Sequence, residues 1–244
     1  MAKINLTIAD GLAVIELNDP PANTYSYEMM QEIDRAVLEA RMDADTHVIV
    51  LRGAGDRFFC AGANIGMLKD ADPDFKYYFC LHANETLNRL EQTPKLVIAA
   101  LNGHTVGGGL EVALGVLPGT GGTQRLARLV GKARAIELMA TGRLMTMDEA
   151  HALGIVTEVW GDEDLQGRPF GDAVLDYARQ FTPPHKASRA VGRMKRAVQS
   201  GAEAGFLEGL SIERELQQLL FQGEDAREGI AANLEKRKPQ FQGK

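Results

Sequence analysis

Hydrophobic and polar positions follow two different periods in the first hundred residues of this chain. Short alternating runs flank Asp10-Gly11, which predicts a β-hairpin with a tight turn. Ser26 is a candidate N-cap, because apolar residues recur at helical spacing after it. Two unbroken apolar runs, typical of strands buried on both faces, flank a second helical stretch. The predicted strands are residues 4–8, 13–17, 48–51 and 96–101, and the predicted helices are residues 27–44 and 75–92.

This order of strand, helix and strand predicts an α/β fold with a parallel sheet. The pattern after residue 123 is mostly helical, with one short strand predicted over residues 156–159. Pro183-Pro184 marks the predicted boundary between an α/β core, residues 1–183, and a helical region, residues 184–244. Thr146 and Glu149 have the spacing of a capping box. The helices predicted in this part are residues 124–130, 132–140, 147–153, 172–181, 185–200, 205–220 and 226–236.

The composition is that of a globular protein: 45% of the 244 residues are hydrophobic and 25% are charged. No apolar run approaches the roughly 20 residues that span a bilayer. The first residues lack the long apolar region and the cleavage site of a signal peptide. We therefore expect a cytoplasmic protein without a membrane partner. Cys60 and Cys80 are too few for a disulfide framework or a zinc site, so no metal is expected. The net charge of −6 argues against nucleic acid as the main partner but allows an anionic small molecule held by local cations.

A glycine turn at residues 107–109 is the first candidate for a ligand site. It follows the predicted strand at residues 96–101 and precedes a run of helix formers. Glycines leave backbone N–H groups open to close approach by a ligand, and a helix N-terminus adds a positive dipole end. Glu111 lies in the first turn of that helix. A plainer interpretation is that the glycines only permit the turn and Glu111 only complements the dipole.

A second run of small residues follows another apolar stretch. Ala61, Gly62 and Ala63 come directly after Phe58-Phe59-Cys60. In open α/β sheets, ligands bind at the carboxyl ends of strands. Two strand ends with small residues therefore predict one ligand site between them. A glycine-rich run at residues 119–123 lacks the Gly-Lys-Ser/Thr ending of a phosphate loop and is given little weight.

Several motifs in a fixed order resemble the crotonase superfamily (enoyl-CoA hydratase/isomerase) over nearly the whole chain. They are FCAGANI at residues 59–65, VIAALNG at 97–103, GGGLE at 107–111, GVLPGTGGTQRL at 115–126, A-x-x-x-G-I-V at 150–156 and EKRKP at 235–239. The resemblance implies a spiral of repeated β-β-α units with a helical C-terminal trimerisation region. It also implies homotrimers, often paired into hexamers, and an acyl-CoA thioester substrate. CoA would then be part of the substrate, and no separate cofactor is expected.

The resemblance also implies roles for individual residues. By position, Ala63 and Gly108 are similar to the residues whose backbone N–H groups form the oxyanion hole, and Glu111 to the catalytic carboxylate. Lys236 is similar to a lysine that reaches the phosphate or adenine of CoA, possibly in a neighbouring subunit, although such a basic run is usually only solvated. His104 has no necessary role in the family pattern, and Cys60 is interpreted as a small core residue. The other residues implied at the substrate are Ala61, Gly62, Asn64, Ile65 and Gly107.

The sequence departs from the family pattern between Leu114 and Gly115. The helix that begins after residue 109 ends within a turn or two, and no strand follows to complete the unit. A relative would have on the order of twenty more residues here, enough for a strand and its crossover. The resemblance places the second catalytic acid of hydratases in that piece. We interpret the gap as an omitted segment rather than a true deletion, because the surrounding motifs are intact.

The sequence alone is consistent with three hypotheses about function. The first is an enzyme of fatty-acid or related lipid metabolism that hydrates a 2-enoyl-CoA to a 3-hydroxyacyl-CoA. The second is an isomerase or a thioester hydrolase that uses the same oxyanion hole. The third is a binding protein, for example for RNA, against which the net charge and the intact GGGLE motif count.

Overall fold

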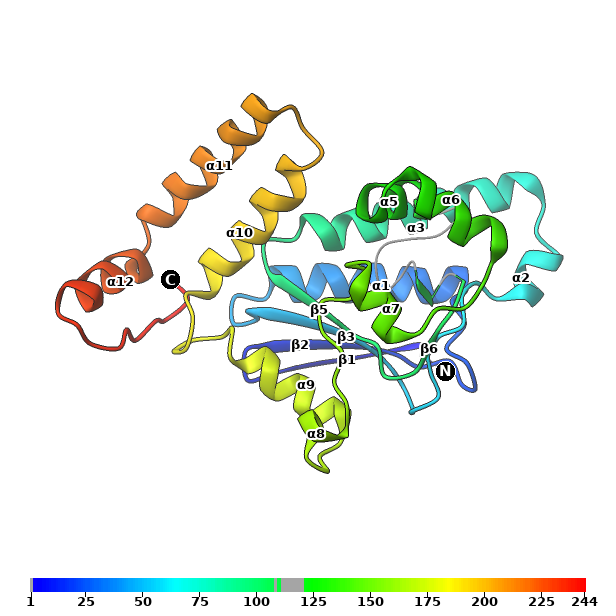
Figure 1. Ribbon diagram of the computed structural model, residues 1–244, viewed down its shortest axis with the longest axis horizontal. Helices are drawn as coiled ribbons and strands as arrows, with labels where there is room; N and C mark the ends of the chain where they lie inside the picture. The colour runs from blue at the N-terminus through cyan, green and yellow to red at the C-terminus, as the bar shows by residue number, and fades with distance from the viewer. Residues whose placement is uncertain (1, 108, 111–120) are drawn as a thin grey trace.

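The computed structural model describes residues 2–107, 109–110 and 121–244 of the chain. Within these residues the strands form a four-stranded sheet in the order β1-β2-β3-β5 and a small sheet of β4 and β6 (Figure 1). The strands are β1 (Ile4–Ala9), β2 (Leu12–Leu17), β3 (Val48–Gly53), β4 (Phe58–Cys60), β5 (Leu96–Ala100) and β6 (His104–Thr105). The helices are α1 (Tyr27–Met42), α2 (Ile65–Lys69), α3 (Pro73–Gln92), α5 (Gly122–Val130), α6 (Lys132–Thr141), α7 (Met147–Ala152), α8 (Asp162–Leu165), α9 (Phe170–Arg179), α10 (Ser188–Gly201), α11 (Phe206–Phe221) and α12 (Glu224–Leu234).

The predicted hairpin and the predicted parallel sheet are both confirmed. Strands β1 and β2 pair antiparallel, and β2, β3 and β5 run parallel to one another. The hairpin turns at Asp10 and Gly11, whose positive φ angles of 52° and 78° suit a two-residue turn that matches the right-handed twist of the strands. The α/β fold class inferred from the order of elements is therefore observed, with a mixed sheet at its centre.

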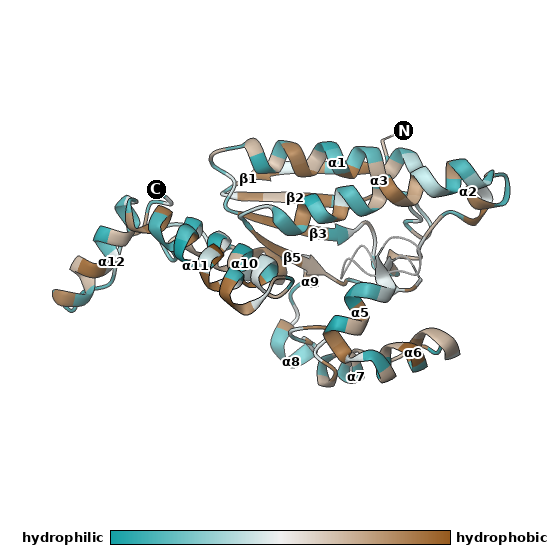
Figure 2. Cartoon of the chain, turned by 90° about the horizontal axis from the view of Figure 1, so that it is seen from above, coloured by the Kyte–Doolittle hydropathy of each residue, from teal (hydrophilic) through white to brown (hydrophobic). Residues whose placement is uncertain are grey.

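Helices cover both faces of the main sheet. Alternate residues of β2 and β3, such as Ile15 and Ile49, pack with α1 and α3 on one face, while Val48 and Val50 pack with α9 on the other. Figure 2 shows α1 and α3 lying together on one side of β1, β2 and β3. Helix α1 begins as predicted, because the Ser26 side chain accepts a hydrogen bond from the Met29 N–H. Burial on both faces explains why β3 is an unbroken apolar run.

The C-terminal helices extend away from this core. Helix α10 packs against α3 and β5, and α11 packs mainly against α10. Figure 1 shows α11 and α12 projecting from the body of the molecule. No residue of α11 is buried in the single chain, and the apolar side chains of Phe206 and Leu207 are 80% and 78% exposed. The described part of the chain holds no helix that is both long enough and apolar enough to cross a bilayer.

The strand predicted over residues 156–159 is wrong: the structure assigns no strand there. These residues face β5 across an apolar groove of about 500 Å³, which is also lined by aromatic residues of α9. In the described part of the chain, β5 is an edge strand of its sheet. A strand needs a neighbour to share its backbone hydrogen bonds, and the groove separates residues 156–159 from the nearest candidate.

Lys195 fastens α10 to the core. Its Nζ donates hydrogen bonds to the backbone oxygens of Leu90, Glu91 and Thr93, at distances of 3.0, 2.6 and 3.0 Å. These oxygens belong to the C-terminal end of α3, where a cation complements the helix dipole. Burial lowers the pKa of Lys195 to about 8. The three hydrogen bonds stabilise the charged ammonium group, whereas the loss of hydration on burial destabilises it.

We expect Lys195→Met to lower the free energy of unfolding by about 1–3 kcal/mol, because it leaves buried carbonyl groups without a donor. The measurement is urea unfolding, with Lys186→Met, an exposed lysine, as the matched control. Between pH 8 and about 10 the unfolded chain retains the Lys195 proton and the folded chain releases it, so the wild type gains stability as pH rises. The deficit of the variant should widen over that range. A deficit that is absent, or that narrows with pH, would contradict this account.

Candidate functional site

The loop after β4 presents a backbone amide that its neighbours do not use. Tyr25 donates from N–H to the carbonyl oxygen of Gly62, and Asn64 donates from N–H to the carbonyl oxygen of Tyr25, both at 2.9 Å. Tyr25 thus forms a parallel bridge opposite Ala63. In such a bridge the hydrogen bonds go to the two flanking residues, so Ala63 directs its own N–H away. Among hydrogen bonds between described residues, none is donated by the Ala63 N–H.

The glycine turn after β6 lies directly against this loop. The Val106 N–H donates to the Cys60 carbonyl oxygen at 3.2 Å, which continues the parallel pairing of β4 and β6. A Cβ added at Gly109 would overlap that same Cys60 oxygen, so only glycine permits this approach. A Cβ at Gly107 would lie 4.0 Å from the Ala61 oxygen. The structure therefore brings the two predicted strand ends together.

Two asparagine side chains hold the flanks of the site. Asn23 is 1% exposed, and its Nδ2 donates to the carbonyl oxygens of Ala54 and Phe58 at 3.0 and 2.9 Å. The Asn102 Oδ1 accepts from the Gly53 N–H at 3.0 Å, and its Nδ2 donates to the Gly53 oxygen at 2.9 Å. Loop backbone that would otherwise be buried without partners is satisfied in this way. Sequence analysis missed Asn23; the available signal was an asparagine after two prolines, where a left-handed residue is tolerated, and its φ is 50°.

Asn64 and Ile65 have different roles at the edge of this loop. Asn64 caps α2, because its Oδ1 accepts a hydrogen bond from the Met67 N–H at 3.0 Å. It therefore fixes the direction in which the chain leaves Ala63. Ile65 is the first residue of α2 and is 81% exposed. Ala63 itself is half-buried against the main core. Of the residues implied at the substrate, Ala61, Gly62, Asn64, Ile65 and Gly107 all lie in or beside the paired loops.

Lys236 is not brought to this loop pair within one chain. It is exposed and follows α12, at the opposite end of the molecule from α2 (Figure 1). Gly108 and Glu111 lie outside the described residues. Cys60 is fully buried, as expected of a core residue, and His104 is exposed with its ring 5.5 Å from that of Phe58. In the described part of the chain, no three His, Cys, Asp or Glu side chains are grouped as metal ligands.

Comparisons with known proteins point to one family. The model of the enoyl-CoA hydratase/isomerase family matches residues 7–114 and 111–244. A probable enoyl-CoA hydratase of Bacillus subtilis (strain 168) is 32% identical, with all of both chains covered. A crotonyl-CoA hydratase of Syntrophomonas wolfei is also 32% identical, with 94% of each chain covered. The crystal structure of an enoyl-CoA hydratase from Geobacillus kaustophilus HTA426 is 38% identical, with a TM-score of 0.92 over 100% of this chain and 98% of the other.

The same comparisons bear on the interruption predicted at Leu114-Gly115. The two stretches that match the family model meet at residues 111–114. The alignment with the Bacillus subtilis relative has 276 positions, 32 more than the 244 residues of this chain. That relative therefore has residues without a counterpart here, whether the segment was omitted or deleted, and the choice of an omitted segment stays a prediction.

We expect Gly109→Ala to lower the free energy of unfolding by about 1–3 kcal/mol or more, because the new methyl group must push the turn away from the Cys60 carbonyl. Gly171→Ala is the matched control: in α9, its added Cβ would lie 3.4 Å from the flexible end of Arg52, and alanine favours a helix. Thermal unfolding of both variants measures the difference. Equal stability of the two would show that the loops are not held by this contact.

Proposed function

Because this chain belongs to the enoyl-CoA hydratase/isomerase family, we propose that it hydrates a 2-enoyl-CoA to a 3-hydroxyacyl-CoA. The observation that supports this most directly is the Ala63 amide, which points away from its bridge and lies beside the glycine turn at residues 107–109. A free N–H at this position suits a thioester oxygen. We take the reaction to belong to fatty-acid or related lipid metabolism in the cytoplasm.

The chemistry of hydration explains what each group would do. When water adds to the double bond, negative charge develops on the thioester oxygen, and the N–H groups of Ala63 and Gly108 would stabilise it. Fixed donors of this kind are worth about 10²–10³-fold in rate each, because they need no reorganisation. Glu111 would orient or deprotonate the water. No separate cofactor takes part in this proposal.

The sequence leaves open whether the enzyme hydrates, isomerises or hydrolyses its substrate, and the names of two relatives favour hydration. The relatives from Bacillus subtilis and Syntrophomonas wolfei bear the names enoyl-CoA hydratase and crotonyl-CoA hydratase. Isomerisation and thioester hydrolysis use the same oxyanion hole and remain as outcomes of the test. RNA binding without catalysis is the outcome that would remove the enzymatic proposal.

Crotonyl-CoA is the substrate with which to test the proposal. Hydration removes the conjugated double bond, so we expect absorbance of the enoyl thioester to fall while free thiol stays constant. Release of free CoA would instead identify a hydrolase, and a shifted double bond on a 3-enoyl-CoA would identify an isomerase. No turnover of enoyl-CoA substrates of several chain lengths would contradict an enzymatic role.

We expect Glu111→Gln to reduce kcat by roughly 10²–10⁴-fold with little change in acyl-CoA affinity, because glutamine retains the shape but cannot act as a base. If Glu111 only complements a helix dipole, the change would cost a few tenths of a kcal/mol of stability and leave turnover intact. Glu85→Gln, an exposed position on α3, is the control. The measurements are kcat, acyl-CoA affinity and circular dichroism. A folded Glu111→Gln protein with wild-type kcat would refute the catalytic role.

We also expect the protein to form trimers or hexamers. Helix α11 has no buried residue in the single chain, and α12 exposes Leu234 to 79%, so these helices have apolar surface available to other copies. Lys236 follows α12 and would then be free to reach the site of a neighbouring subunit. Sedimentation velocity should show a trimer or hexamer, and Phe206→Glu/Leu207→Glu should shift it toward monomer. A stable wild-type monomer would contradict both the assembly and the role of Lys236.

A further inference from the structure

We infer a second binding site, for a phosphate-type dianion, in a cavity of about 230 Å³ between residues 43–47 and the start of α10. The inference is independent of the hydratase proposal. His47 directly precedes β3, and Lys95 directly precedes β5, so the cavity lies at the amino ends of these parallel strands. The Ala63 loop follows the carboxyl end of β4 instead. The two sites therefore belong to different ends of the α/β core.

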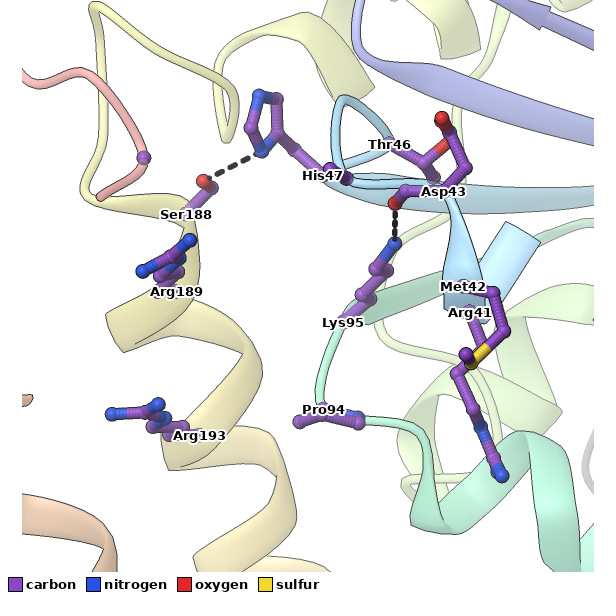
Figure 3. A pocket seen from close by; sticks show the side chains of 12 residues that line it. Arg41, Met42, Asp43, Thr46, His47, Pro94, Lys95, Ser188, Arg189 and Arg193 are labelled. Carbon is purple, nitrogen blue, oxygen red and sulfur yellow. Dashed lines mark hydrogen bonds between the residues drawn. The ribbon is translucent and has the colours of Figure 1, made fainter. Parts of the chain in front are cut away.

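The cavity is lined predominantly by positive charge, in a chain whose net charge is −6. Asp43 is the only carboxylate among its lining residues. The basic residues that line it are Arg41, His47, Lys95, Arg189 and Arg193. Figure 3 shows Arg189 and Arg193 one turn apart on α10, with His47 and Ser188 joined across the upper part of the cavity.

Two of these basic side chains form hydrogen bonds with the protein, and these bonds fix their positions at the edge of the cavity. Lys95 Nζ donates to the backbone oxygens of Ala40 and Asp43, both at 2.6 Å. The Arg41 side chain donates from Nη2 to the Arg89 carbonyl oxygen at 2.7 Å. These bonds hold the cations in place without neutralising them, because their partners are carbonyl groups.

Arg189 and Arg193 are different, since no hydrogen bond or ion pair to another described residue is found for either guanidinium. Arg189 is exposed and Arg193 is half-buried. Burial, and then the charge of Arg189, lower the pKa of Arg193. A planar guanidinium binds a phosphate oxygen pair with two hydrogen bonds, and two of them on one helix face can share one dianion.

His47 couples this site to pH. Its Nδ1 lies 2.9 Å from the Ser188 Oγ, and its pKa is lowered by burial and by the charges of Lys95 and Arg189, against the opposing effect of Asp45 and Asp225. An anion in the cavity would offset the two cations and favour the charged imidazole. Because binding and protonation are linked, the anion should bind more tightly as pH falls.

The size of the cavity limits the ligand. Sites for drug-sized ligands generally exceed about 300 Å³, so this space suits a single phosphate group rather than a whole acyl-CoA. The phosphate could be inorganic phosphate or the phosphate monoester of a nucleotide whose remainder extends into solvent. The uncapped N-terminus of α10 adds the positive end of a helix dipole on the side of Ser188.

The test is isothermal titration of the full-length protein with inorganic phosphate and with adenosine 3′,5′-bisphosphate, at constant ionic strength. We expect Arg189→Ala/Arg193→Ala to weaken binding of the accepted ligand by at least about tenfold. Arg35→Ala/Arg134→Ala removes the same charge from exposed positions on α1 and α6 and should leave binding unchanged. Binding of either ligand that Arg189→Ala/Arg193→Ala weakens and the control variant does not supports the site, and such binding of the nucleotide alone identifies a phosphate monoester as its ligand. No binding, binding that Arg189→Ala/Arg193→Ala leaves unchanged, or binding that both double variants weaken equally would overturn it.

A second measurement tests the part assigned to His47. Sulfate keeps its charge between pH 5.5 and 8, so any change in its affinity reports on the protein. We expect sulfate to bind several-fold more tightly at pH 5.5 than at pH 8, and His47→Asn to remove this dependence. Asp45 and Asp225, whose charges oppose the lowering of the His47 pKa, and Asp43, which lines the cavity, are present in both proteins. A pH dependence that His47→Asn leaves unchanged would contradict the placement of the anion beside His47.

Discussion

Two stretches of backbone touch at Cys60 and Gly109, and the candidate site depends on that contact. The pairing of β4 with β6 is only a few residues long, so it cannot by itself hold two loops in register. Because Gly109 has no side chain, the glycine turn can approach the Cys60 carbonyl group directly. The loop that carries Ala63 therefore lies beside the glycine turn. The groups that the candidate site would offer a ligand are thus main-chain atoms. Such donors cannot change rotamer, which is an advantage for stabilising charge that develops at one fixed atom.

Strand β5 has an unpaired edge among the described residues. It is strongly apolar, yet it is an edge strand among the described residues and lines a groove along its whole length. Natural proteins usually protect such edges with charges, bulges or a covering element. In the described part of the chain no strand pairs with this edge, which instead faces residues 156–159 across the groove.

The sequence was sufficient to predict elements whose cause is local. The hairpin at Asp10-Gly11 and the N-cap at Ser26 depend on residues within one turn, and both are observed. Half of the predicted capping box is also observed: the Thr146 Oγ accepts from the Glu149 N–H, but the Glu149 carboxylate binds Arg143 at 2.6 Å instead of the N-cap backbone. A nearby guanidinium offers a carboxylate two charge-assisted hydrogen bonds, which exceed one bond to a backbone amide.

Features that join distant segments were harder to predict. The strand proposed at residues 156–159 has a suitable composition, but a strand also requires a neighbour that composition does not reveal. The role of Asn23 depends on carbonyl groups more than thirty residues away. The expectation that the two strand ends with small residues lie together is met, since Gly109 and Val106 contact Cys60, but the role of Ala63 stays a prediction. The roles implied for Gly108 and Glu111 also stay predictions, which only functional measurements can test.

Helix α10 contacts the core, the basic cavity and helix α11. A Cβ at Gly192 would overlap the carbonyl oxygen of Pro94, so α10 lies against the start of β5 as closely as the glycine turn lies against β4. Arg189 and Arg193 flank that contact on the side of the basic cavity, and Lys195 binds the end of α3 one turn further on. Helix α11 in turn packs on α10. A ligand bound by the two arginines would therefore contact a helix that packs against the core and also against α11, whose apolar side chains are exposed.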